Sequence, residues 1–254
     1  MREFILTNNK NVSKAAFTLA EVLITLGIIG IVAAMTLPAL IQKNNNRVVE
    51  TRLQKFYSTI NQAIQRAEVD YGDKKYWYQD TNHIDTDKDG NPVKGSSTVE
   101  KWWNKYMAPY IKTVDIKYDD SGLPIFMFAD GSALKAIQPG NMRDWLFYTG
   151  DPEKCIAKYG SDTNSRGKCS FAFIFMPGGD GASKDANTSE AWRHHRNKGF
   201  EPYKYYWDGT KDGLINGGSY PGTGCNDSKT AYCTALIQYN GWKIPDYYPF
   251  KVSY

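Results

Sequence analysis

The chain has 254 residues and 41% of them are hydrophobic, which is enough for a real core in one large or two small domains and excludes a disordered protein. Its formal net charge is only +4, and part of that lies in the first sixteen residues, so we expect no nucleic-acid-binding surface. All four cysteines lie in the second half without a C-x-x-C pair, which favours disulfides over zinc.

A long apolar segment follows a basic stretch at the N-terminus. From Val22 to Ile41 there are twenty residues without a formal charge, and at about 1.5 Å of helix rise per residue they span roughly 30 Å of hydrocarbon. We therefore predict a transmembrane helix over about 22–41. One carboxylate, Glu21, lies directly before this run, and a carboxylate just inside a bilayer is costly and by default functional.

Two simpler interpretations of the segment account for less of it. A secretory signal peptide also begins with basic residues, but its apolar region usually has about 7–15 residues and rarely begins with an acid. A plain membrane anchor explains the length and the hydrophobicity, yet it leaves Glu21 as an accident at the membrane edge. This second alternative stays open.

The segment has a fixed order of features: a basic leader, the small residue Ala16, the run FTLAE at 17–21, and an apolar helix that contains Pro38. This order resembles the N-terminus of type IV prepilins and type II secretion pseudopilins, many of which have a helix-kinking proline where Pro38 falls. The departure is Ala16, because that family usually has glycine there. Alanine is small enough that we expect cleavage.

The resemblance implies that a prepilin peptidase cuts between Ala16 and Phe17 and that the new amine of Phe17 is methylated. Glu21 would then neutralise the amine of a neighbouring subunit in a filament. The implied partners are the peptidase, other pilin or pseudopilin subunits, an inner-membrane assembly platform and the lipid bilayer. The implied location is the inner membrane, crossed once, with the C-terminal head outside the cytoplasm, as disulfides also favour, and a filament at the cell surface after assembly.

Beyond Ile41 the apolar pattern becomes one face of a continuing helix. The residues at spacings of three and four are Val49, Leu53, Phe56, Ile60, Ala63 and Ala67. The pattern ends before Gly72, which suits a C-cap. We therefore expect a leader over 1–16, one helix over 17–72 that is kinked at Pro38 and covers a sheet with its second half, and an extracytoplasmic globular head over 73–254.

The head combines one short helix with a series of strands. Ser97 and Glu100 form a capping-box pattern at the start of the helix, and Pro109 ends it. Strand patterns then follow at 113–118, 124–137, 145–148 and 170–176. Asp130-Gly131 supplies a hairpin turn inside the second of these ranges. Together they predict an antiparallel meander.

From residue 177 onward the chain is rich in Gly, Tyr, Asn and Pro, and we expect long loops with a final strand around Thr234–Tyr239. Of three possible disulfide connectivities, pairing of neighbours gives Cys155–Cys169 and Cys225–Cys233. The predicted fold class is therefore α+β: a long N-terminal helix, membrane-spanning in its first half, packed on an antiparallel sheet with long disulfide-pinned C-terminal loops.

One possible metal site precedes the short helix. Asp85, Asp87 and Asp89 alternate before Gly90, as in the first half of a calcium loop, but the twelfth position holds Ser96 instead of a bidentate Glu. A solvated turn is the alternative interpretation. Ca²⁺ is the one cofactor that the sequence suggests, and both interpretations stay open.

Other candidate sites are weaker. His194 and His195 are adjacent, which suits no metal-binding pair, and we expect both on the surface. Aromatic residues make up 14% of the chain and cluster at 76–78, 203–207 and 247–248. Rings on loops suit recognition of sugars or partner proteins, whereas ordinary packing is the alternative.

No nucleophile elbow or zinc-protease helix is present, and paired cysteines cannot act as nucleophiles, so we expect no enzyme. With the resemblance, the sequence predicts a structural subunit of a type II secretion pseudopilus or a type IV pilus. The alternative is a membrane-anchored protein that never polymerises and either binds a glycan or a partner, or hydrolyses a substrate.

Overall fold

The computed structural model describes residues 18–77, 83–137, 142–178, 190–218, 220 and 222–254. The chain divides into two units, Met1–Ile41 and Gln42–Tyr254. Helix α1, Leu19–Tyr71, begins in the first unit and ends in the second, with Pro38 inside it. Gly72 follows with a positive φ of 76°, and because glycine has no Cβ it ends the helix there at little cost.

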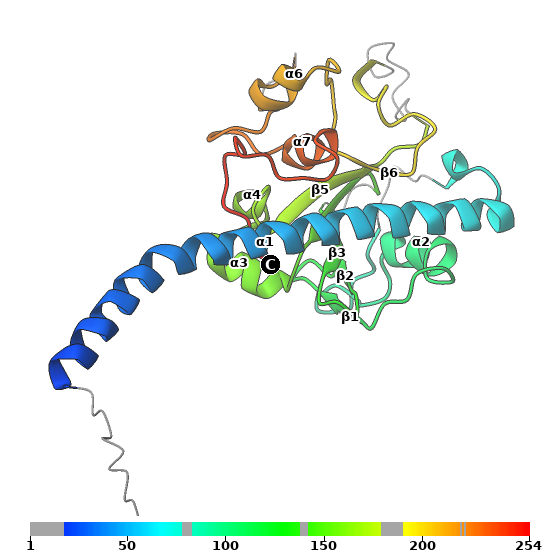
Figure 1. Ribbon diagram of the computed structural model, residues 1–254. Helices are drawn as coiled ribbons and strands as arrows, with labels where there is room; N and C mark the ends of the chain where they lie inside the picture. The colour runs from blue at the N-terminus through cyan, green and yellow to red at the C-terminus, as the bar shows by residue number, and fades with distance from the viewer. Residues whose placement is uncertain (1–17, 78–82, 138–141, 179–189, 219, 221) are drawn as a thin grey trace, which may run out of the picture. The chain divides into compact units, whose positions relative to one another are not determined.

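The second unit is an α+β domain. Its helices and strands after α1 are, in chain order, the short 3-10 helix η1 (Lys74–Tyr76), α2 (Thr98–Tyr106), β1 (Asp115–Tyr118), β2 (Pro124–Met127), β3 (Ala133–Ala136), β4 (Asp144–Tyr148), α3 (Pro152–Tyr159), α4 (Asp162–Ser165), β5 (Ser170–Phe175), β6 (Phe200–Pro202), α6 (Lys211–Asn216) and α7 (Cys233–Tyr239). The strands form one antiparallel sheet of six, and their order in space is their order in the chain (Figure 1). The predicted meander and fold class are confirmed.

The C-terminal half of α1 covers one face of this sheet (Figure 1). All of the apolar residues at the predicted spacing are buried: Val49, Leu53, Phe56, Ile60, Ala63 and Ala67. Phe56 connects the helix to the centre of the sheet, since its ring stacks on Phe147 of β4 with centroids 4.1 Å apart. The same ring meets Phe173 of β5 edge-on at 5.0 Å. Because side chains alternate along a strand, Phe147 and Phe173 mark the sheet face that α1 covers.

Helix α2 adds two tryptophans to this core. The hydroxyl of Ser97 accepts the backbone N–H of Glu100 at 3.1 Å, as the predicted N-cap requires. Trp102 and Trp103 are buried, and Trp103 stacks on Phe126 of β2 with centroids 4.2 Å apart. Trp102 contacts Phe175 of β5 with ring centroids 5.1 Å apart, so the two tryptophans of the helix reach from β2 to β5.

The opposite face of the sheet packs against α3. Leu146 and Tyr148 of β4 and Ala172 of β5 form one buried cluster there with the two cysteines of the first disulfide. Both predicted disulfides are present, Cys155–Cys169 and Cys225–Cys233. The second of them connects the loop after α6 to the start of α7.

One predicted strand is wrong. Residues 233–239 form helix α7, not a strand, and the run from Cys233 to Ile237 is buried throughout. A short run of consecutive apolar residues has no periodicity that separates a buried strand from a buried helical turn. Here the helix packs against β5 and β6 without joining the sheet.

Candidate functional site

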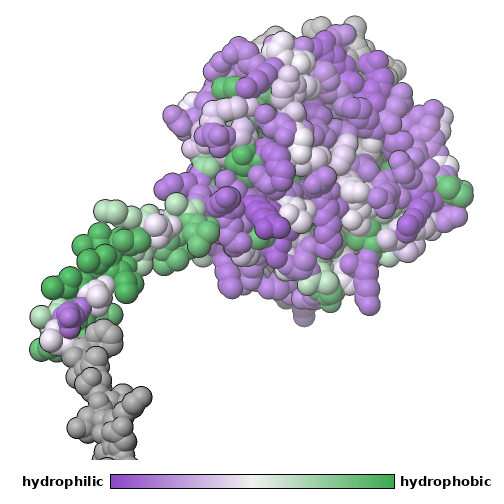
Figure 2. Space-filling model, in the orientation of Figure 1, coloured by the Kyte–Doolittle hydropathy of each residue, from purple (hydrophilic) through white to green (hydrophobic). Residues whose placement is uncertain are grey.

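Most of the large hydrophobic side chains that are exposed among the described residues lie on the N-terminal half of α1. Helix α1 is long and apolar enough to cross a membrane, and none of its most apolar window is buried against the rest of the described chain. Figure 2 shows this half in green, in contrast to the mainly purple surface of the second unit. Exposed apolar surface of this extent marks a membrane or protein interaction site.

At the start of α1, Thr18 and Glu21 form a reciprocal pair. The backbone N–H and the hydroxyl of Thr18 both donate to Glu21 Oε2 at 2.8 Å. In return, the N–H of Glu21 donates to Thr18 Oγ1 at 3.2 Å. This is a capping box, which satisfies N–H groups that the first turn of a helix leaves without partners. The predicted cleavage residues Ala16 and Phe17 lie outside the described residues.

Two glycines lie on the apolar half of α1. A Cβ added at Gly27 or Gly30 would meet no described atom within 4 Å. In membrane proteins such small residues let neighbouring helices approach closely, and Gly30 with Ala34 has the small-xxx-small spacing of such contacts.

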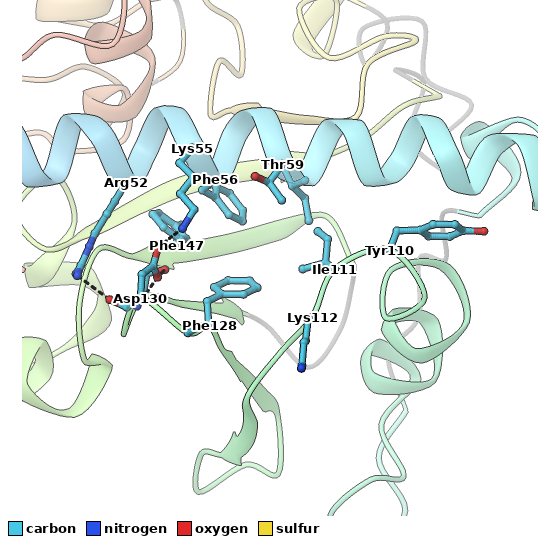
Figure 3. Close-up of a pocket in the computed structure, with 13 residues that line it drawn as sticks. Arg52, Lys55, Phe56, Thr59, Tyr110, Ile111, Lys112, Phe128, Asp130 and Phe147 are labelled. Atoms are coloured by element: carbon cyan, nitrogen blue, oxygen red, sulfur yellow. Dashed lines mark hydrogen bonds and ion pairs between the residues drawn. The ribbon is translucent and has the colours of Figure 1, made fainter.

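In the second unit, a pocket of about 210 Å³ opens between α1 and the β2–β3 hairpin (Figure 3). Its apolar lining consists of Phe56, Ile60, Ile111, Phe128, Ala129 and Phe147. Its basic side chains are Arg52, Lys55 and Lys112, and Asp130 is its carboxylate. The pocket is therefore an apolar hollow with a mainly basic rim.

Most of that basic rim is bound by the protein itself. Arg52 donates to the carbonyl of Asp130 at 2.6 Å and to that of Thr149, and Lys55 Nζ lies 2.9 Å from Asp130 Oδ2. Burial alone would raise the pKa of Asp130, but hydrogen bonds from Ser132 and the ammonium of Lys55 hold it below its ordinary value. Ser132 Oγ donates to Asp130 Oδ1 at 2.5 Å, and because the N–H of Ser132 donates to the same oxygen at 3.1 Å, this contact belongs to the hairpin turn.

The three aspartates of the calcium-loop pattern do not surround a common centre. Asp87 Oδ1 accepts the backbone N–H groups of Asp89 and Asn91, each at 2.9 Å, while Asp85 Oδ1 lies 2.9 Å from His83 Nε2. Among the described residues no group of three His, Cys, Asp or Glu side chains could hold a metal ion. The geometry favours the turn that the sequence left open as the alternative.

The expectation that both adjacent histidines lie on the surface is wrong. His195 is fully buried and His194 is half-buried. The reason is local, because His195 lies three residues after Trp192 in a helical turn, and the two rings pack together with centroids 5.4 Å apart. Burial, with the positive charge of Lys204, lowers the pKa of His195 well below its ordinary value.

The hydrogen bonds of His195 are incomplete. Its Nε2 accepts the backbone N–H of Lys204 at 3.2 Å, so the neutral ring carries its proton on Nδ1. No described residue accepts a hydrogen bond from Nδ1, although that atom is buried. A protonated ring would therefore lose the bond to Lys204 without gaining a partner.

In the described part of the chain these features define a class of protein: a membrane-length apolar helix that continues into a disulfide-bonded α+β domain with a six-stranded antiparallel sheet. Over residues 39–252 the chain belongs to DUF6613, a family of unknown function. This match covers nearly the whole second unit. No curated protein and no solved structure matches the chain.

Proposed function

We propose that this protein is a pilin-like structural subunit, which a type II secretion or type IV pilus system processes and assembles into a filament through α1. The observation that carries the proposal is helix α1 itself. One half of it is apolar and unburied, and the other half covers the sheet with one face. A helix of this kind suits a protein that leaves the bilayer by exchanging lipid for neighbouring copies of the same helix.

Glu21 has the chemistry that such an assembly needs. Thr18 occupies only Oε2 of the carboxylate, and no described residue donates to Oε1. Cleavage between Ala16 and Phe17 would create an α-amine, and a carboxylate in an apolar environment requires a cation close by. The proposed pairing joins Glu21 of one subunit to the amine of Phe17 in its neighbour.

The proposed partners follow from the same pathway. They are the prepilin peptidase, other pilin or pseudopilin subunits, the inner-membrane assembly platform and the bilayer. We place the head outside the cytoplasm because all four cysteines of the chain are paired, and structural disulfides persist in oxidising compartments.

Processing provides the first test. The full-length chain is coexpressed with a prepilin peptidase, and mass spectrometry of the product is expected to show an N-terminus at Phe17. Ala16→Leu is expected to leave the precursor uncut and to abolish filaments in the fraction sheared from cells. Asp120→Asn, an exposed carboxylate replacement far along the chain, serves as the control and leaves both unchanged. The proposal fails if Ala16→Leu gives the same mature mass and the same sheared fraction as the wild type.

The alternative is a membrane-anchored protein that never polymerises, and the capping box is the observation that favours it. The box gives Glu21 a role within its own helix, so this carboxylate would be useful in a plain anchor as well. The two proposals differ in what they require of Glu21. Filament assembly requires its negative charge, whereas a plain anchor requires only a side chain that caps the helix.

A further inference from the structure

A second pocket lies on the side of the sheet away from α1. Its volume is about 310 Å³, and the side chains that give it chemical character are Arg143, Asp144, Arg166, Tyr203, Tyr220 and Thr223. Ala172 and Ile174 of β5, which alternate with the phenylalanines facing α1, form part of its floor. The Cys225–Cys233 disulfide holds the loop that carries Thr223. A volume of this size is at the lower end of the range for small-molecule sites.

Arg166 gives the pocket an unused positive charge. The side chain is half-buried, its Nε is shielded from solvent, and none of its N–H groups donates to a described residue. An arginine that is partly desolvated without an acceptor lowers stability, because the hydration it loses is not replaced. Such a group therefore calls for a ligand with an acceptor.

The other arginine of the pocket is already paired. Arg143 Nε lies 3.0 Å from Asp144 Oδ1, and its Nη2 lies 2.7 Å from Asp144 Oδ2. This bidentate pair is neutral as a unit. The side chains that line the pocket thus carry a net charge of +1, which comes from Arg166. One positive charge matches a single carboxylate better than a doubly charged phosphate.

Two tyrosines supply an aromatic wall and a free hydroxyl. Tyr220 is 46% exposed, and its ring lies parallel to that of Tyr206 with centroids 6.0 Å apart. No described residue accepts a hydrogen bond from the hydroxyl of Tyr203. Burial and the negative charge of Asp144 raise the pKa of Tyr203, so this hydroxyl stays protonated and can donate. Flat rings beside free donors suit a sugar, which has an apolar C–H face and a rim of oxygens.

We propose that this pocket binds an acidic saccharide, a pyranose whose carboxylate pairs with Arg166 and whose ring lies against Tyr203 and Tyr220. The planar guanidinium matches a carboxylate in a two-point geometry that an ammonium group could not supply. This binding does not depend on cleavage or filament assembly, so it can fail while the proposed function stands, and the reverse also holds.

The test uses the full-length protein in detergent micelles, with saturation-transfer NMR to detect binding and titration to measure it. The probes are the methyl glycosides of glucuronic and galacturonic acid, with methyl glucoside and acetate as the matched neutral sugar and simple anion. We expect at least one uronide to bind and both controls to bind more weakly by about tenfold or more, because each lacks either the charge or the ring.

Variants then assign the binding to the pocket. Arg166→Gln is expected to weaken the uronide by about tenfold or more while the melting temperature stays within about 2 °C of the wild type, because no described residue depends on its N–H groups. Tyr203→Phe keeps the ring and removes one donor, so a smaller loss is expected. Arg47→Gln, an exposed arginine on α1, is the control and leaves binding unchanged.

Three results would overturn the proposal. The first is the absence of binding by either uronide at millimolar concentration. The second is equal affinity for the uronide and for methyl glucoside or acetate, which would leave no acidic-saccharide site. The third is wild-type affinity in Arg166→Gln.

Discussion

Thr18 caps the helix that Glu21 belongs to, and Glu21 caps Thr18 in return, through bonds of 2.8 Å, 2.8 Å and 3.2 Å. The carboxylate thus serves its own helix through Oε2. Its charge and its capping geometry can be separated by substitution, because glutamine also forms capping boxes.

We therefore predict that Glu21→Gln keeps α1 helical but loses filament assembly, since an amide cannot neutralise an α-amine. Thr18→Val removes the cap and should reduce the helicity of the first turn at a cost of about 1 kcal/mol while assembly persists. Circular dichroism in micelles and the quantity of sheared filaments are the two readouts. If Glu21→Gln assembles like the wild type and Thr18→Val does not, the carboxylate acts only as a cap and the filament proposal loses its main support.

The contact between Phe56 and the sheet predicts a large loss of stability on truncation. Phe56 stacks on Phe147 and meets Phe173, Phe200 and Phe128 at larger distances. Phe56→Ala should lower the free energy of unfolding by about 3 kcal/mol. This value is at the lower end of the range for buried Phe→Ala substitutions, because one side of Phe56 already faces the open pocket beside α1.

Urea unfolding followed by tryptophan fluorescence checks this value. Val69→Ala is the matched control, since Val69 is 85% exposed on the same helix, and it should change the free energy of unfolding by no more than about 0.5 kcal/mol. Equal effects of the two substitutions would mean that α1 does not anchor the sheet through Phe56.

Each disulfide closes a short loop, and removal should destabilise the second unit. The separations are 14 residues for Cys155–Cys169 and 8 for Cys225–Cys233. Loop-closure entropy then predicts losses of about 3 and about 2.5 kcal/mol for the two double Cys→Ala variants. Urea midpoints with and without reductant measure the effect. In a variant without any cysteine the reductant should not change the urea midpoint. A change of the midpoint in that variant would show that the reductant acts on something other than the disulfides.

The buried His195 predicts that stability falls on mild acidification. Its folded-state pKa is lowered, so below its ordinary value of about 6.5 the unfolded chain binds more protons than the folded one. The stabilising contribution is complete above about pH 6.5 and decreases as the pH falls below it. His194, whose pKa is also lowered by burial, adds to the same slope.

Melting temperatures measured between about pH 8 and 5 test this expectation. His195→Gln should flatten the decline, whatever its effect on the absolute melting temperature. His83→Gln is the control, because the side chain of His83 is 76% exposed. An unchanged slope in His195→Gln would show that another group causes the decline.

Local patterns predicted most of the fold. The buried face of α1 was readable residue by residue because helical periodicity repeats within a few residues. The β2–β3 hairpin was readable from Asp130-Gly131, where Gly131 has a φ of 79° and Asp130 Oδ1 accepts the N–H of Ser132. Helix α3 was missed although its limits are also local, with Asp151 as N-cap and Gly160 at its end with a φ of 85°.

Strand β6 could not be predicted in this way. It has three residues, Phe200–Pro202, with the carboxylate of Glu201 in the middle and a proline that lacks an N–H. Glu201 is buried only because Lys204 Nζ lies 2.9 Å away and Tyr57 Oη donates to it at 2.6 Å from α1. Tyr57 is 144 residues away in the chain, so the partner that permits this burial is invisible to any local pattern.

Of the candidate sites, likewise, one follows from a local sequence pattern and one depends on residues far apart in the chain. The capping box of α1 is a local pattern, because Thr18 and Glu21 are three residues apart in the chain. The pocket around Arg166 draws on β4, β5 and three separate later parts of the chain, which contribute Tyr203, Tyr220 with Thr223, and Ala231. No spacing in the sequence brings those parts together, and only the sheet order does.

Glu50 of α1 binds the C-terminal segment: its carboxylate contacts Lys243 Nζ and accepts the N–H of Ile244, both at 2.9 Å. Gln42 likewise donates to the carbonyl of Val252 at 3.2 Å. A ribosome delivers residue 50 well before residue 244, so α1 is synthesised long before the chain that completes its burial. During that interval the apolar face of α1 is accessible to chaperones and to other nascent chains. The segment around residues 243–252 is synthesised later, and only then can it pack against α1.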